Sequence, residues 1–157
     1  SLDDRPVISA AKVRAEATGE PAVAIELPDG RIITGKTSSL LGASSAMLLN
    51  ALKALAGIDD AAELISPTTI GPIQDLKVKH LGNRNPRLHT DEVLLALSIC
   101  ASTDERAKAA MEQLQNLKGS EVHSSVILSH VDTNVFRKLG VNLTCEPEYQ
   151  NNQLYHK

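Results

Sequence analysis

Apolar and polar positions alternate with two different periods along the chain, which predicts both helices and strands. Residues 6–18 repeat apolar side chains at helical spacing and end at a glycine-containing break. Residues 22–27 and 31–34 are rich in strand-forming residues. The tripeptide Pro28-Asp29-Gly30 between them favours a tight turn, so these segments predict a β-hairpin.

The longest apolar stretch of the chain runs from Leu40 to Ile58 and predicts a buried helix over about residues 39–56. Gly57 is expected to end this helix, because glycine accepts the left-handed conformation of a C-cap. Four polar residues interrupt the stretch: Ser44, Ser45, Asn50 and Lys53. These interruptions favour a buried core helix over a membrane-spanning one.

The second half of the chain continues the mixed order of elements. We predict a short helix over residues 59–65 and a break at Ser66-Pro67. Pro72 suits the first turn of a helix that runs to Leu81. Thr90 is expected to cap a helix that is apolar on every side and therefore internal. The remaining predicted elements are a helix over 102–119, a strand over 121–128, a helix over 132–139, a strand over 141–145 and a polar tail over 148–157.

Together these elements predict a single domain over residues 1–157 with an α/β architecture, an α+β arrangement being the alternative. We expect a small mixed sheet of about four strands, including the hairpin, covered by about five or six helices. A chain of this length buries about 70% of its unfolded surface. Because it opens on Ser1 and not on Met, we expect an excised fragment of a longer protein.

Composition narrows the classes of partner. Aromatic residues make up only 2% of the chain, so the core must be aliphatic and stacking platforms for nucleic acid are not expected. A net charge of −3 gives no general attraction to nucleic acid or to an anionic membrane. Cys100 and Cys145 stand alone without a metal or disulfide spacing, which indicates reduced thiols in a cytoplasmic protein.

Gly30 to Thr37 spells the phosphate-binding P-loop pattern, with Gly30 followed after four residues by Gly35-Lys36-Thr37. A true P-loop needs a buried strand that ends before the first glycine. Here Pro28 and Asp29 precede that glycine, and Arg31 to Thr34 has strand composition. We therefore interpret the match as a hairpin turn and its second strand.

A narrower site remains where this strand passes into the apolar helix. Lys36, Thr37, Ser38 and Ser39 lie at the expected helix N-terminus, and free N–H groups, hydroxyls and a lysine suit an anion. The structural alternative is that Ser38 or Ser39 only caps the helix. The two interpretations are compatible.

One basic cluster stands out in an otherwise acidic chain. It consists of Lys77, Lys79, His80, Arg84, Arg87 and His89. Arg87 and His89 adjoin a predicted helix N-terminus, so they are candidate ligands of a phosphate or carboxylate. The alternative is a solvated helix face and loop.

Other reactive side chains form weaker patterns. His89, Asp91 and Glu92 could hold a metal or transfer a proton, and Glu121 with His123 offers a second pair, but no metal-ligand spacing is present. His123 and Ser124 point to opposite faces of a strand and cannot form a Ser–His pair, whereas His123 and Ser125 could share a face. Cys100 lies in an apolar helix as a small core residue. No metal site, cofactor or catalytic residue is assigned.

Three segments are familiar as a set: PAVAIELPDGRIITGKTSSLLGASSAMLLNALKALAGI, NPRLHTDEVLLALSICAST and EVHSSVILSHVDTNVFRKLGVNLTCEP. They resemble the C-terminal part of the bacterial proteins grouped as domain-of-unknown-function family 1846. The resemblance covers nearly the whole chain. It implies a separately produced C-terminal domain of a cytoplasmic bacterial protein that forms an oligomer. The N-terminal part of the longer protein is a further expected partner, and no particular activity is implied.

Two functions follow from these observations. In the first, the domain belongs to a larger cytoplasmic enzyme and presents Lys36, Thr37 and Ser38, with Arg87 and His89, to a small anionic molecule. In the second, it is a structural domain that forms a homo-oligomer through its aliphatic surface and binds no small molecule. A metal-dependent hydrolase built on His89 and His123 is a third possibility.

Overall fold

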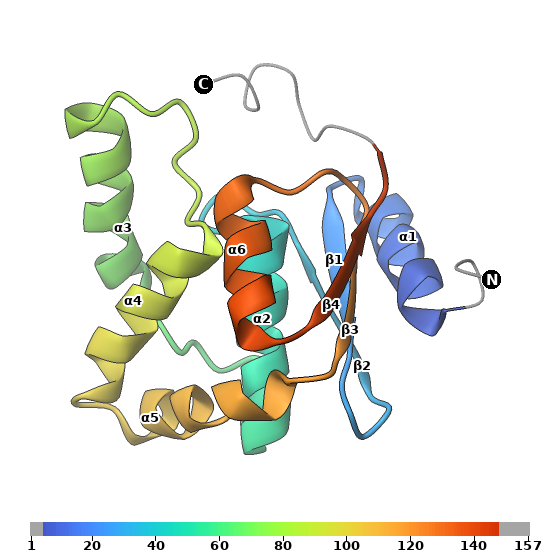
Figure 1. Cartoon of the computed structure of the whole chain (residues 1–157). Coiled ribbons are helices and arrows are strands. Elements are labelled where there is room, and N and C mark those ends of the chain that lie inside the picture. Colours follow the sequence, from blue (N-terminus) through green and yellow to red (C-terminus); the bar gives the residue numbers. More distant parts are fainter. Residues whose placement is uncertain (1–4, 148–157) are drawn as a thin grey trace.

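The computed structural model describes residues 5–147 as a four-stranded sheet with helices on both faces (Figure 1). This confirms the predicted α/β class. The helical elements are α1 (Pro6–Thr18), α2 (Ala43–Ala56), α3 (Pro67–Asp75), the π-helical turn η2 (Leu76–His80), α4 (Thr90–Ala101), α5 (Glu105–Glu112), the 3-10 turn η3 (Leu114–Leu117) and α6 (His130–Leu139). The strands are β1 (Ala22–Glu26), β2 (Ile32–Lys36), β3 (Glu121–Ser124) and β4 (Asn142–Cys145).

The sheet is mixed, with strand order β2-β1-β3-β4. β1 runs antiparallel to both of its neighbours, with Ala22 opposite Lys36 and Ala24 opposite His123. β3 and β4 are parallel and are joined through α6, a β-α-β crossover. Because β1 reverses direction between them, β2, β3 and β4 all point the same way. The carboxyl ends of β2 and β3 therefore lie at the same edge of the sheet.

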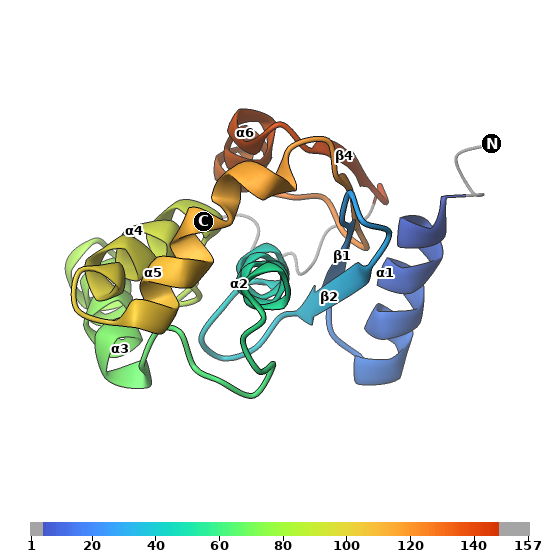
Figure 2. The same ribbon diagram turned by 90° about the horizontal axis from the view of Figure 1, so that it is seen from below.

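The sheet separates two unequal layers. α1 covers one face, where Val7, Ile8 and Ala11 pack on Ala24. The other face carries the main core around α2, with α4, α5 and α6 packed beyond it, as Figure 2 shows. Leu48 and Leu52 of α2 are completely buried there, together with Phe136 of α6. The core is almost wholly aliphatic, as the composition predicts.

The predicted hairpin is confirmed, and it explains the P-loop spelling. β1 and β2 pair in register from Ala22–Lys36 to Glu26–Ile32. Gly30 has a φ of 92° and its N–H bonds the Leu27 carbonyl, so this glycine turns the hairpin. The N–H groups between Gly30 and Lys36 belong to a turn and a paired strand. They are not a phosphate cradle.

Gly35 has a separate packing role at the contact between β2 and α2. A Cβ placed on Gly35 would lie 2.1 Å from the main-chain nitrogen of Met47. Only glycine lets the backbone of α2 approach β2 this closely. The second glycine of the motif is therefore required by helix–strand packing.

Several predicted helix boundaries are wrong. α2 begins at Ala43 and not at residue 39, because the Ser38 hydroxyl instead accepts hydrogen bonds from the N–H groups of Leu40 and Leu41 in a turn. Residues 59–65 form turns and no helix. α3 begins at Pro67, with Ser66 as its N-cap, so the expected break at this dipeptide is a helix start.

Pro72 lies inside α3 and not at its beginning. His89, not Thr90, is the N-cap of α4, and Thr90 is its first helical residue. Nor is α4 internal, since Leu95 and Ile99 are 65% and 67% exposed. The predicted helix over 102–119 is split into α5 and η3, and the strand predicted over 121–128 ends at Ser124. The predicted tail over 148–157 lies outside the described residues.

Candidate functional site

A pocket lies where the carboxyl ends of β2 and β3 lead into helices. Its volume is about 430 Å³. Its walls come from the start of α2, the loop before α4 and the loop between β3 and α6: Gly42–Ser44, Asn85, Arg87–His89, Val126–His130 and Asp132. In α/β proteins ligands bind in a crevice at the carboxyl ends of parallel strands. The pocket occupies that position.

Contacts between the loop before α2 and the loop before α4 hold the first turn of α2 at this pocket. Leu88 donates its N–H to the Leu40 carbonyl and accepts from the N–H of Gly42 at 3.2 Å. The Ser45 hydroxyl adds a 2.9 Å bond to the Leu88 carbonyl. The loop before α2 is thereby joined to the loop before α4, which brings the two helix starts together.

The N-terminus of α2 has no side-chain cap. Its N-cap is Gly42, which cannot supply one, and no acidic residue lies in the first turn. Ser44 is 2% exposed and lines the pocket, yet its hydroxyl has no hydrogen-bond partner among the described residues. Buried polar groups are normally satisfied. The start of this 14-residue helix therefore offers unsatisfied donors to whatever fills the pocket.

The other two helix starts at the pocket are capped from within the protein. Asp132 Oδ1 accepts from the N–H of Thr90 at 2.9 Å and from its hydroxyl at 2.7 Å. The N-cap of α6 is Ser129, whose hydroxyl accepts from the N–H of Asp132. The capping of α4 and α6 makes the uncapped α2 the part of this pocket that is suited to an external anion.

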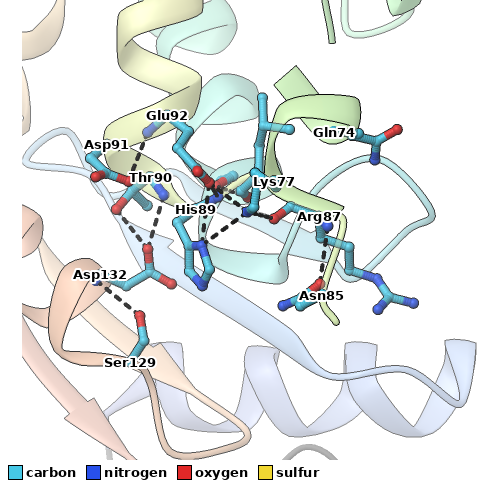
Figure 3. Close-up of polar contacts among 12 residues, drawn as sticks. Gln74, Lys77, Asn85, Arg87, His89, Thr90, Asp91, Glu92, Ser129 and Asp132 are labelled. Atoms are coloured by element: carbon cyan, nitrogen blue, oxygen red, sulfur yellow. Dashed lines mark hydrogen bonds and ion pairs between the residues drawn. The ribbon is translucent and has the colours of Figure 1, made fainter. Parts of the chain in front are cut away.

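Beside the pocket a buried ion pair fixes the loop that carries Arg87 and His89 (Figure 3). Lys77, on the π-helical turn, is 2% exposed, and its Nζ lies 2.7 Å from Glu92 Oε1 and 2.5 Å from the Arg87 carbonyl oxygen. Glu92 also accepts the N–H of His89 at 2.8 Å. Part of the basic cluster is thus neutralised within the fold.

Glu92 stays ionised well into acid. Burial opposes ionisation, but the hydrogen bonds from His89 and Lys77 and the charge of Lys77 outweigh it, and the pKa of Glu92 falls to about 2. The pair therefore keeps its geometry at neutral pH. Its role at the pocket is positioning, because Lys77 and Glu92 do not line the pocket.

The six site residues predicted from the sequence form two groups in the structure. Arg87 and His89 line the pocket, whereas residues 36–39 are not among its lining. Arg87 Nε donates to the Ser38 carbonyl at 2.6 Å, so one contact links the two groups. Thr37 is 2% exposed and its hydroxyl has no partner among the described residues. Lys36 ends β2, and the carbonyl of Ser39 accepts from Gln74. Binding by Lys36, Thr37, Ser38 and Ser39 stays a prediction.

His123 lies on the α1 side of the sheet, away from His89. It is 2% exposed, its Nδ1 is 2.7 Å from the Thr144 hydroxyl, and its Nε2 is 3.0 Å from Glu146. Burial lowers the pKa of His123 although Glu146 opposes this. The Ser125 hydroxyl accepts from the N–H of Ala22, and both ring nitrogens of His123 lie within hydrogen-bond distance of Thr144 and Glu146 instead. The structure therefore does not unite His89 and His123 in one site.

Two further observations bear on the kind of site. Within residues 5–147 no three His, Cys, Asp or Glu side chains gather as the ligands of a metal ion would. None of the helices described is both long and apolar enough to span a bilayer. Cys100 is partly buried and Cys145 is exposed, and neither forms a disulfide.

The sequence did not single out Ser44 or Asp132 as site residues. Ser44 carried a signal, since it is a polar residue in the most apolar stretch of the chain. Asp132 had none, because its partner Thr90 lies 42 residues away in the chain.

Comparison with known proteins matches residues 3–155 to the family described as "Domain of unknown function DUF1846, C-terminal". UPF0371 proteins of Corynebacterium efficiens and Corynebacterium urealyticum are 58% and 60% identical over 157 residues. A UPF0371 protein of Streptococcus pyogenes serotype M5 is 57% identical over 155 residues. These alignments cover 99–100% of the chain and 31–32% of the relatives. The chain thus spans about a third of the length of these relatives.

Proposed function

Because the chain belongs to the family of C-terminal DUF1846 domains, and its relatives are about three times longer, we propose that it is the ligand-binding domain of a larger cytoplasmic enzyme. The ligand is a small molecule with a phosphate or carboxylate group. It binds in the pocket between α2, α4 and α6, with Arg87 and His89 in the wall. The rest of the longer protein is its permanent partner.

The observation that carries this proposal is the uncapped, buried start of α2. The N–H groups of the first turn have no acceptor within the helix, and the partial positive charge of the helix N-terminus favours an anion. The buried Ser44 hydroxyl adds a donor that lacks a partner among the described residues. An oxyanion in the pocket would satisfy these groups together.

Arg87 supplies charge at the same place. Its Nε donates to the Ser38 carbonyl, and its terminal guanidinium nitrogens have no hydrogen-bond acceptor among residues 5–147, so they are available to an anion. This bond also places the Ser38 loop within reach of Arg87. We propose that Lys36 to Ser39, the segment that this bond joins to Arg87, contribute further polar contacts to an anion bound by Arg87.

The test is a thermal-denaturation panel with inorganic phosphate, phosphate monoesters, nucleotides and small carboxylates. We expect at least one anion to raise the melting temperature of the 157-residue chain, since a ligand at about 100 times its Kd stabilises the folded state by about 2.7 kcal/mol. Ser44→Ala and Arg87→Ala should reduce this shift in melting temperature. Lys36→Ala should also reduce it if the segment Lys36 to Ser39 contributes to binding.

Ser98→Ala is the matched control, because Ser98 is exposed on α4 and bonds only the Leu95 carbonyl of its own helix. It should leave the shift unchanged. A panel in which no anion stabilises the protein, or in which Ser44→Ala and Ser98→Ala behave alike, would contradict the proposal.

A second function, assembly of the protein, is favoured by two groups of exposed apolar side chains, which together we call the apolar face. Leu76, Val78 and Leu81 are 42–65% exposed at and just after the π-helical turn, and Leu95 and Ile99 are exposed on α4. Such side chains mark surfaces that bury against a partner. We propose that this face packs against a second copy of the chain, making the protein a homo-oligomer. Dissociation on dilution, measured by sedimentation, tests this function separately from ligand binding.

A further inference from the structure

The proposed anion pocket also contains a carboxylate, and this limits what can bind there. Asp132 lines the pocket and is 8% exposed. Its Oδ1 is occupied by the N–H and the hydroxyl of Thr90. Among the described residues no donor bonds its Oδ2, and Figure 3 shows this oxygen pointing away from Thr90, to the side where His89 lies. Asp132 therefore presents a free acceptor to the pocket.

The charge of Asp132 is stabilised where it lies. The carboxylate lies at the N-terminus of α4 and in the first turn of α6, where both helix dipoles attract a negative charge. It needs no cationic ligand group to balance it. A neutral donor such as a hydroxyl can bond the free oxygen, and hydrogen bonds to charged groups are stronger than neutral ones.

The two ends of the pocket thus have opposite preferences. At the α2 end, the N–H groups of Ala43 and Ser44 have no acceptor within the helix, and the buried Ser44 hydroxyl has no partner among residues 5–147, which suits the oxygens of a phosphate ester. At the Asp132 end, an anion would be repelled and a hydroxyl attracted. A bare phosphate satisfies the first end only.

We propose that the ligand is a hydroxylated phosphate monoester, such as a polyol or sugar phosphate, with its phosphate at the start of α2 and a hydroxyl donating to Asp132 Oδ2. This inference rests on the proposed anion-binding function and adds the ligand class to it. A pocket of about 430 Å³ has room for both ends of such a small molecule.

The test compares two phosphate esters by isothermal titration calorimetry. Propyl phosphate and glycerol 3-phosphate share a three-carbon chain and differ by two hydroxyls. We expect the wild-type chain to bind glycerol 3-phosphate about tenfold more tightly, which is about 1.4 kcal/mol. Asp132→Asn keeps an oxygen to cap Thr90 but turns the free acceptor into a donor. It should reduce the preference to less than about twofold without weakening propyl phosphate.

Ser44→Ala is the second variant, and it should weaken both esters alike and keep the preference. If the wild-type chain binds the two esters equally, or Asp132→Asn retains the preference, the ligand class is wrong while anion binding stands. If neither ester nor any other anion binds, the proposed function itself fails. The wild-type comparison decides the ligand class even if Asp132→Asn lowers the stability of α4.

Discussion

At the scale of single residues, most polar groups buried at or beside the pocket have hydrogen-bond partners that fix their positions. Lys77 is a lysine with almost no exposed surface, and it is tolerated because Glu92 and the Arg87 carbonyl both accept from its ammonium group. Asp132 is buried with two donors from Thr90. Among the residues that line the pocket, Ser44 differs, since its buried hydroxyl has no partner within residues 5–147. The residue that breaks the pattern is the one that points to a ligand.

The ion pair predicts a dependence of stability on pH. Glu92 has a pKa of about 2 in the folded protein, below its ordinary value, so between about pH 5 and pH 2 the unfolded chain binds more protons than the folded one. The contribution of Glu92 to stability is therefore complete above pH 5 and is lost as the pH falls toward 2. Urea denaturation across this range should show a loss on the order of 2–3 kcal/mol.

Glu92→Gln should flatten this dependence and, at pH 7, destabilise the protein by about 3 kcal/mol, because it leaves the buried Lys77 ammonium without a counter-charge. Asp91→Asn is the control, since Asp91 is exposed in the same helical turn and should change little. Equal effects of the two substitutions would show that the Lys77–Glu92 contact is not formed in solution.

At the scale of elements, the helix starts determine where a ligand can bind. The hairpin and α1 were predictable because their signals are local: a Pro-Asp-Gly turn and a glycine at the helix end. The start of α2 was not. Ser38 and Ser39 look like caps in the sequence, but the Ser38 hydroxyl is used in a turn, and the loop is held by Leu88. A contact between segments this far apart in the chain cannot be predicted from the spacing of neighbouring residues.

The same holds for the caps of α4 and α6. Asp91 and Glu92 are correctly expected in the first turn of α4, and Glu92 does accept the N–H of His89. The cap from Asp132, which comes from another helix, could not be read from spacing. The sequence therefore located Arg87 and His89 near a helix start but could not predict which start lacks a cap.

Gly35 tests the packing of α2 on β2. Gly35→Ala would place a Cβ within 2.6 Å of three main-chain atoms of Ala46 and Met47, which side-chain adjustment cannot relieve. We expect it to lower the free energy of unfolding by about 3 kcal/mol or more. Chemical denaturation measures this loss.

Gly71→Ala provides the comparison, because Gly71 lies inside α3 with nothing within 4 Å of the added Cβ. It should be neutral or stabilising by up to about 1 kcal/mol. If both substitutions had the same effect, the close approach of α2 to β2 would be refuted, and the glycine of the P-loop spelling would need another explanation.

At the scale of the whole molecule, the polar groups of the pocket and the side chains of the apolar face lie on different parts of the surface. The pocket is built from helix starts on the edge of the sheet, and the apolar face lies on the π-helical turn and α4. Leu95 and Ile99 are four residues apart and so lie on one side of α4. Neither residue lines the pocket, so we expect that substitutions there can disrupt assembly without altering ligand binding.

Replacing Leu95 and Ile99 together with lysine should abolish self-association, because burying each of these side chains contributes about 1.5–3 kcal/mol. Val13→Lys is the control, since Val13 is 60% exposed on α1 at the other side of the sheet. Sedimentation velocity over a range of concentrations measures the effect. A wild-type chain that stays monomeric at every concentration would rule out the assembly that we propose.

The central claim is that an anion binds at the uncapped start of α2. Backbone amide NMR during a titration with glycerol 3-phosphate tests it most directly, because amide shifts report the contacted N–H groups one by one. We predict saturable shifts that are largest at Ala43, Ser44 and Ser45 and are greatly reduced in Ser44→Ala. A titration that leaves these three amides unmoved, while the protein stays folded, would contradict the claim.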